Sequence, residues 1–226
     1  MTTRTHRKNI SVFINWCIFK RYMHQYTLKN IPKPPLSATL PKYYEQDRIE
    51  AILYAIEICS RTAFERVRNK AIIAVGCMTG LRRGELLALR LSDLDLINRV
   101  VHVQATTSKS KKERYVPIPL KLYEILTAYI SVRNESAAVG CVDLWVSSTT
   151  GSKLSHEGLK HITEKLSKQL GFKLRMHSLR HSYGTFSYAV SHDIVAVQQN
   201  IGHSDLNTTM KYVAALSKDK HDTAEL

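Results

Sequence analysis

The last fifty residues of the chain contain three kinds of side chain that phosphoryl chemistry uses. The segment His177-Ser178-Leu179-Arg180-His181 is followed by Gly202-His203 and, nine residues after that histidine, by Tyr212. An arginine can hold a phosphate through two hydrogen bonds, an imidazole can move a proton, and a phenol can attack phosphorus. Each group also has an ordinary interpretation, because a lone tyrosine is most often a core aromatic and paired histidines are most often surface or satisfied core groups.

Two upstream segments could serve the same chemistry. In residues 79–85, Arg82 lies at a helix junction and Glu85 follows three residues later on the same face. This pair is either a phosphate-binding arginine oriented by a carboxylate or an ordinary intrahelical ion pair. Residues 108–114 are rich in cations, which suits a hairpin tip that contacts phosphates and supplies a proton, or a solvated turn that protects a strand edge. The cations are Lys109, Lys111, Lys112 and Arg114.

A metal site is not expected. His177 and His181 are four residues apart, as in half of a zinc site, but no glutamate follows His177 and the four cysteines lie far from both in the sequence. The cysteines form no C-x-x-C pair and are interpreted as reduced residues of a cytoplasmic protein. We therefore expect neither a metal nor another cofactor.

The composition favours a polyanionic partner. The formal net charge is +14 in 226 residues, and the pI is about 9.7. Such an excess of cations suits a nucleic-acid backbone, although a merely soluble cationic surface would also produce it. The sequence contains no secretory signal and no run of 18 apolar residues, so we expect no membrane association.

The hydrophobic periodicity predicts a predominantly α-helical α+β fold with a small antiparallel β-sheet or hairpin. Pro32, Pro34 and Pro35 break any helix and mark the best domain boundary. A turn is expected at 92–95 and a hairpin from strands 100–104 and 114–118, with a third strand at 142–147. Helices are expected at 7–26, 45–58, 66–78, 83–89, 119–132, 155–170, 177–190, 193–200 and 206–213.

Taken together and in order, these segments resemble the catalytic domain of the tyrosine recombinases, the phage integrase family. The matching motifs are Thr-Gly-Leu-Arg followed by Glu85, Lys109 before the Lys-Glu-Arg-x-Val-Pro of residues 112–117, His-x-Leu-Arg-His at 177–181, Gly-His at 202–203, and Tyr212. Each motif is weak alone, but the ordered set is highly specific and extends from about Leu40 to Val213. The resemblance implies a tyrosine recombinase catalytic-domain-like fold.

The resemblance also implies a role for each residue. Tyr212 would be the nucleophile, and Arg82 and Arg180 would hold the non-bridging oxygens of the scissile phosphate. Lys109 would protonate the departing 5′-hydroxyl, with Lys111 and Lys112 close enough to compete for this role. His177 and His203 would hydrogen-bond the phosphate, while Glu85 and His181 would support these groups. Lys111, Lys112 and Arg114 are expected to contact DNA.

The implied function is site-specific cleavage and rejoining of DNA through a 3′-phosphotyrosine, with no nucleotide cofactor. The implied partners are double-stranded DNA and accessory DNA-bending proteins. The chain itself is expected to form a homotetramer on DNA and to be a monomer or weak oligomer without DNA. A bacterial or phage-encoded, nucleoid-associated cytoplasmic protein is expected. Three alternatives remain: an integrase-like DNA-binding protein with weak or no turnover, a type IB topoisomerase, and a basic regulator with a fortuitous motif.

The expected domain organisation follows the family pattern with a short N-terminal part. Residues 1–30 resemble the last helix of a core-binding domain, so the chain is expected to be either an N-terminally truncated protein or a lone catalytic domain with a residual helix. Residues 31–41 are a proline-rich linker, 42–213 the catalytic domain and 214–226 a polar tail.

Overall fold

The computed structural model describes residues 3–24, 42–108, 111–202, 209–210 and 212. The chain divides into two compact units, residues 1–39 and 40–226. In the first unit, helix α1 (Thr3–Phe19) begins earlier and ends earlier than expected. The helix ends there because Arg21 adopts a left-handed conformation, with φ of 59°. The amide of Lys20, just before it, still donates a helical hydrogen bond to the Trp16 carbonyl. The expected linker and the C-terminal tail both lie entirely outside the described residues.

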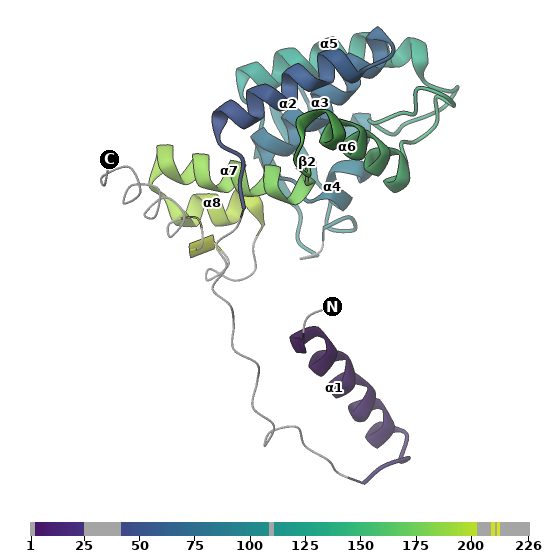
Figure 1. The fold of residues 1–226 in the computed structure, drawn as a ribbon, viewed down its shortest axis with the longest axis vertical. Helices are drawn as coiled ribbons and strands as arrows, with labels where there is room; N and C mark the ends of the chain where they lie inside the picture. The colour runs from purple at the N-terminus through teal and green to yellow at the C-terminus, as the bar shows by residue number, and fades with distance from the viewer. Residues whose placement is uncertain (1–2, 25–41, 109–110, 203–208, 211, 213–226) are drawn as a thin grey trace. The chain divides into compact units, whose positions relative to one another are not determined.

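The second unit is built around α3 (Ala63–Thr79), which packs on both α5 (Leu120–Ser136) and α7 (Met176–Ser191) (Figure 1). Five consecutive residues of α3, from Ala71 to Val75, are buried. The helix starts three residues before the expected position because the Thr62 side chain accepts a hydrogen bond from the amide of Glu65, and it ends at the left-handed Gly80. Other α-helices in the described part of this unit are α2 (Gln46–Cys59), α4 (Arg83–Ala88), α6 (His156–Leu170) and α8 (Ile194–Ile201), and Leu91–Asp93 forms a 3-10 helix.

A three-stranded antiparallel sheet has the order β1-β2-β3, from Leu94–Asp95, Val100–Val103 and Arg114–Pro117. The expected hairpin is confirmed, with Val101 opposite Val116 and Val103 opposite Arg114. These three valines are buried and attach the hairpin to the core. The register leaves Arg114 at the end of β3, beside the turn.

Two predictions about the sheet were wrong. Residues 142–147 are not a strand, and the third strand is β1, within the segment expected to be a turn. Asp143 and Val146 form only isolated antiparallel bridges, with Arg90 and Lys153. Nε of buried Arg133 donates to the Leu144 carbonyl at 3.3 Å. No continuous ladder forms, so the apolar run at 142–147 mainly reflects burial in the core.

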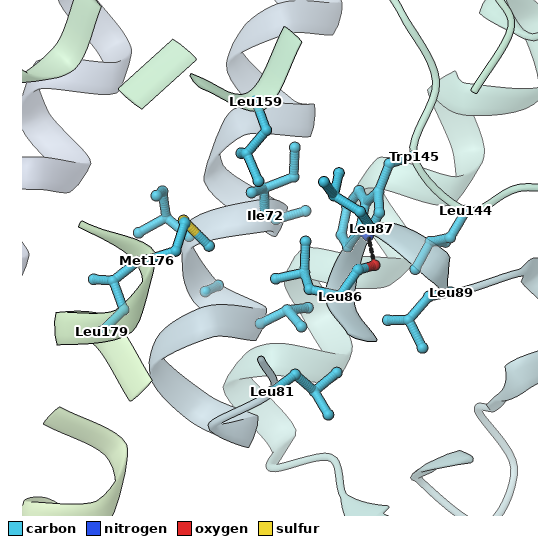
Figure 2. Close-up of a cluster of buried hydrophobic side chains, with 14 of the residues drawn as sticks. Ile72, Leu81, Leu86, Leu87, Leu89, Leu144, Trp145, Leu159, Met176 and Leu179 are labelled. Atoms are coloured by element: carbon cyan, nitrogen blue, oxygen red, sulfur yellow. Dashed lines mark hydrogen bonds between the residues drawn. The ribbon is translucent and has the colours of Figure 1, made fainter. Parts of the chain in front are cut away.

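Trp145 anchors this segment in the main hydrophobic core. Its ring is fully buried and stacks on Tyr129, with centroids 5.2 Å apart. Figure 2 shows its indole nitrogen donating to the Leu86 carbonyl at the end of α4, over 2.8 Å. The short helix α4 is therefore fixed by a core side chain, which matters because Arg82 directly precedes it. Among the described residues, none of the helices combines the length and apolar character of a membrane-spanning segment.

Candidate active site

Glu85 is the most deeply buried carboxylate of the site, with 2% of its surface exposed. It accepts from the backbone amide of Arg82 at 2.9 Å and from the Arg82 side chain at 2.9 Å. The expected pairing of Arg82 with Glu85 is therefore present, and it caps the start of α4. Through this pair the helix start holds the Arg82 side chain in a fixed orientation.

Arg114 is a second and stronger partner of Glu85. Its Nη2 and Nη1 donate to the two carboxylate oxygens at 2.7 and 3.3 Å, which is the fork geometry of a bidentate pair. Burial alone would raise the pKa of Glu85, but the hydrogen bonds from Arg114 and from the Arg82 amide hold it at about 2. Glu85 is thus ionised at neutral pH and lies between two arginines.

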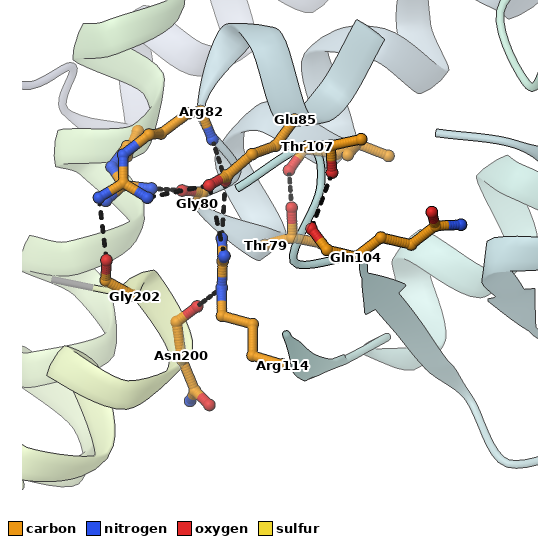
Figure 3. Close-up of polar contacts among 11 residues, drawn as sticks. Thr79, Gly80, Arg82, Glu85, Gln104, Thr107, Arg114, Asn200 and Gly202 are labelled. Carbon is orange, nitrogen blue, oxygen red and sulfur yellow. Dashed lines mark hydrogen bonds and ion pairs between the residues drawn. The ribbon is translucent and has the colours of Figure 1, made fainter. Parts of the chain in front are cut away.

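The same arginines reach the C-terminus of α8. Arg82 Nη2 donates to the Gly202 carbonyl at 2.9 Å, and Arg114 Nε donates to the Asn200 carbonyl at 3.0 Å (Figure 3). The last carbonyls of a helix lack intrahelical partners and carry partial negative charge, so both contacts are favourable. Gly202 ends α8 in the left-handed conformation, immediately before His203.

Arg180 is directed from α7 toward this cluster. It is 1% exposed, and its Nη1 donates to the Gly80 carbonyl at 2.7 Å. Its buried Nη2 has no hydrogen-bond partner among the described residues. Burial first, and then the charge of Arg82, lower the pKa of Arg180 to about 10, so it remains charged at neutral pH. A buried donor without a partner is costly and fits a site that receives an acceptor from a ligand.

His177 and His181 lie on the same face of α7, with ring centroids 4.2 Å apart. Burial, followed by the charges of Arg180 and Arg82, lowers the pKa of His177. His177 is therefore neutral at pH 7, with one ring nitrogen as donor and one as acceptor.

Tyr212 is fully buried next to these groups. Its hydroxyl lies 3.3 Å from His181 Nδ1. Burial raises the pKa of the phenol, while Arg180 and Arg82 oppose that rise. The ring lies flat against Gly184, where an added Cβ would be 2.5 Å from two ring carbons. Only a glycine leaves room for the ring in this position.

The structure describes only some of the remaining site residues that the sequence predicted. Lys109 and His203 lie outside the described residues, as does part of the helix expected at 206–213, although Tyr212 itself is helical. Lys111 and Lys112 are exposed near the hairpin tip. Within the described residues, no three His, Cys, Asp or Glu side chains gather in a way that could hold a metal ion.

Sequence reasoning missed two features of this site. The contact of Arg114 with DNA stays a prediction, but the sequence did not indicate that its guanidinium faces Glu85 and α8 with only 10% of the side chain exposed. The close approach of Tyr212 to Gly184 was also missed. A glycine four residues after Arg180, inside a helical pattern, is the one signal that could have indicated it.

A groove of about 890 Å³ extends from His177 along α6. Glu164 is the one acidic side chain in its lining. Seven arginines and lysines also line it, so the groove is strongly cationic. They include Arg83, Lys160, Lys165, Lys168, Lys173 and Arg175.

The model of the phage integrase family matches residues 42–219. The chain belongs to the phage integrase family. Its match to this family includes Arg82, Glu85, Arg114 and the whole of α7, so the expected fold and the resemblance are both confirmed. The family assignment covers most of the second unit.

Curated relatives include the tyrosine recombinase XerC of Actinobacillus pleuropneumoniae and XerH of Helicobacter pylori. The first is 34% identical over 185 residues, which are 80% of this chain and 57% of that protein. The second is 31% identical over 200 residues, which are 85% of this chain and 54% of that protein. This phage integrase family member therefore spans a little over half the length of these relatives.

Solved structures with the same fold include an XerH site-specific recombinase bound to a palindromic difH substrate in a post-cleavage complex. That structure has a TM-score of 0.73 and 29% identity, covering 91% of this chain and 59% of the other. An XerA recombinase has a TM-score of 0.66 at 26% identity, covering 86% of this chain and 69% of the other. This family member thus has the fold of tyrosine recombinases.

Proposed function

We propose that this chain is the catalytic part of a site-specific DNA recombinase that cleaves and rejoins double-stranded DNA through a 3′-phosphotyrosine. The observation that carries the proposal is the buried Nη2 of Arg180, which has no hydrogen-bond partner among the described residues and lies near the Tyr212 phenol. The neighbouring His177 lines a cationic groove. The named activities of XerC and XerH relatives support the same reaction for this chain.

The arginines supply the electrostatic part of the mechanism. Arg180 Nη2 takes one non-bridging oxygen of the scissile phosphate, and Arg82 takes the other by exchanging its bond to the Gly202 carbonyl for a bond to the phosphate. The two fixed guanidinium groups then stabilise the negative charge that develops on these oxygens in the transition state. His177 and His203 donate further hydrogen bonds to the phosphate.

The covalent step is an exchange of one ester for another. Tyr212 Oη forms a bond to phosphorus, the bond from phosphorus to the 5′-oxygen breaks, and that oxygen takes a proton from Lys109, with Lys111 or Lys112 as the competing donors. The phenol loses its proton, and His181 Nδ1, 3.3 Å from the hydroxyl, is the proposed acceptor. Attack by a 5′-hydroxyl on the phosphotyrosine reverses the step, so rejoining needs no nucleotide.

A trapped covalent complex tests this proposal. Sites are first selected from a random duplex library and then rebuilt with a nick beside the cleaved bond, so that the 5′-hydroxyl fragment diffuses away. The 25.8 kDa chain should become attached to DNA in a denaturant-resistant complex. Tyr212→Phe should bind the same DNA and form no complex, because only the phenol oxygen is removed. Equal amounts of complex from both proteins would contradict the assignment of the nucleophile.

The alternatives give different results in the same experiment. Selected DNA that is bound but never attached would identify an integrase-like binding protein with little or no turnover. Relaxation of a supercoiled plasmid that lacks the selected site would indicate a type IB topoisomerase. Binding that is unaffected by Arg180→Ala would favour a basic regulator, because loss of a phosphate contact weakens binding to every sequence.

We further propose the assembly and organisation that this function requires. Residues 1–30 would be the end of a core-binding domain, 31–41 a linker, 42–213 the catalytic domain and 214–226 a tail, in a cytoplasmic, nucleoid-associated protein. The chain would be a monomer or weak oligomer alone and a homotetramer when two DNA sites are joined, with DNA-bending proteins as accessory partners. Sedimentation of the chain with and without a selected site would test the change in assembly.

A further inference from the structure

Arg114 connects three separate elements of the site. It begins β3, forms the bidentate pair with Glu85 of α4 at 2.7 and 3.3 Å, and donates from Nε to the Asn200 carbonyl of α8 at 3.0 Å. All three nitrogens of its guanidinium are therefore engaged inside the protein. The neighbouring Lys112 is exposed instead, so the two adjacent cations of the hairpin face different surroundings.

The ion pair between Arg114 and Glu85 leaves more of the positive charge of Arg82 available to a ligand. Glu85 carries one negative charge and accepts from both arginines. Without Arg114, Arg82 would be the counter-ion of a buried carboxylate and would be held by it. With Arg114 as the bidentate partner, Glu85 is satisfied and the cluster keeps a net positive charge, so Arg82 can release the Gly202 carbonyl and take a phosphate oxygen.

Arg114 also fixes the end of α8. An ideal Cβ on Gly202 would lie 3.1 Å from Arg114 Cζ and Nη1, so the guanidinium packs directly on the residue that precedes His203. The segment that leads to His203 and Tyr212 therefore starts from a point that Arg114 holds by a hydrogen bond and by contact. This arrangement connects the hairpin to Gly202, the last described residue before His203.

We propose that Arg114 is a positioning residue: it ties Glu85 to the C-terminus of α8 and so sets both the orientation of Arg82 and the start of the segment that carries Tyr212. The effect on the reaction rests on the proposed function, but the effect on α8 does not. The structural half of the proposal, the effect of Arg114 on α8, can therefore be measured without DNA, and the catalytic half is its effect on the reaction.

Hydrogen exchange of the intact chain tests the structural half. Arg114→Lys keeps the charge and removes the fork, so amide exchange across residues 194–202 should become faster by roughly tenfold or more as a charge-assisted hydrogen bond is lost. Gly202→Ala should have the same effect because its methyl group pushes on the guanidinium. Its matched control is Gly171→Ala, which also places alanine at a left-handed helix C-terminus, with φ of 69°, but meets nothing within 4 Å. Unchanged exchange in α8 of Arg114→Lys, or equal effects of the two glycine variants on α8, would overturn the proposal.

A second measurement separates positioning from DNA contact. The salt dependence of binding to a random-sequence duplex is compared between Arg114→Gln and Lys112→Gln, which remove one charge each from the same hairpin. A phosphate contact reduces the slope of log K against log salt by about 0.9. We expect that reduction for Lys112→Gln and not for Arg114→Gln, since Arg114 is occupied inside the protein. A reduction of about 0.9 for Arg114→Gln would show that Arg114 contacts DNA and would overturn the proposal.

The catalytic half is measured on the nicked substrate. Arg114→Lys should lower the rate of covalent complex formation by roughly tenfold or more, with DNA affinity and its salt slope unchanged. A normal rate in Arg114→Lys would refute this half. If the unmodified chain forms no complex at all, the proposed function fails, while the exchange experiment still decides the structural role of Arg114.

Discussion

Gly184→Ala should displace the Tyr212 ring from its position against α7. The added Cβ would lie 2.5 Å from Cε2 and Cζ of the ring and 2.9 Å from Cδ2. Carbon atoms normally approach to about 3.5–4.0 Å, so the methyl group overlaps the ring by about 1 Å. The ring must shift or leave the small cluster that it forms with Val197 and Ile201.

The free energy of unfolding gives the size of this effect. Alanine in place of a helical glycine otherwise stabilises a helix by up to about 1 kcal/mol. Overpacking of a filled core costs about 1–3 kcal/mol. Gly84→Ala is the matched control, because Gly84 also lies in a helix and an added Cβ there meets nothing within 4 Å. We expect Gly184→Ala to be less stable than Gly84→Ala by about 1–3 kcal/mol.

Urea unfolding of a double-mutant cycle identifies the ring as the cause. Tyr212→Phe keeps the ring and should retain the penalty of Gly184→Ala, whereas Tyr212→Ala removes the ring and should abolish it. A Gly184→Ala protein as stable as Gly84→Ala would refute the reasoning. A penalty that persists in the Tyr212→Ala background would do the same, since the clash would then involve another group.

Three other predictions concern charge. Folding lowers the pKa of Glu85 from 4.5 to about 2, so its pairing stabilises the fold fully above pH 4.5 and less as the pH falls toward 2. Urea unfolding should show that the free energy of unfolding falls by about 2 kcal/mol between pH 7 and pH 3, and that Glu85→Gln lacks this decrease. Burial should raise the pKa of the Tyr212 phenol above its ordinary value of 10. The pH dependence of the absorbance difference between the unmodified chain and Tyr212→Phe measures it, and a midpoint at or below 10 would contradict the burial of this side chain. Replacing Lys160 and Lys168 by glutamine should reduce the salt slope of DNA binding by about 1.8, whereas Lys121→Gln on α5, outside the groove, should leave it unchanged.

Local signals in the sequence predicted the helices well. Helix α6 was expected at 155–170 and is found at His156–Leu170, because the Ser155 side chain caps its start and Gly171 ends it. The Arg82–Glu85 pair was predictable for the same reason, since three residues on a helix bring two side chains together. Where a contact is made within one turn, residue types and spacing are sufficient to expect it.

Contacts between distant segments were not predictable from the sequence. Arg114 and Glu85 are 29 residues apart, and no spacing rule joins a strand end to a helix start. The run at 142–147 looked like a strand because it is apolar, but it forms only isolated bridges, and its Leu144 carbonyl accepts from the Arg133 side chain. The family resemblance identified the reacting groups, but it could not show which of the hairpin cations faces inward.

The arrangement of charge is the strongest physical argument that the site binds an anion. Three arginines lie around one carboxylate among the described residues, and burial followed by the charge of Arg82 lowers the pKa of Arg180. Burying Arg180 with one nitrogen that has no partner in the described part of the chain is unfavourable for folding, and a methionine of similar length would avoid that cost. A structure that keeps such a group in place stores a positive potential beside a phenol, and a phosphodiester is the ligand that this potential and this nucleophile can use together.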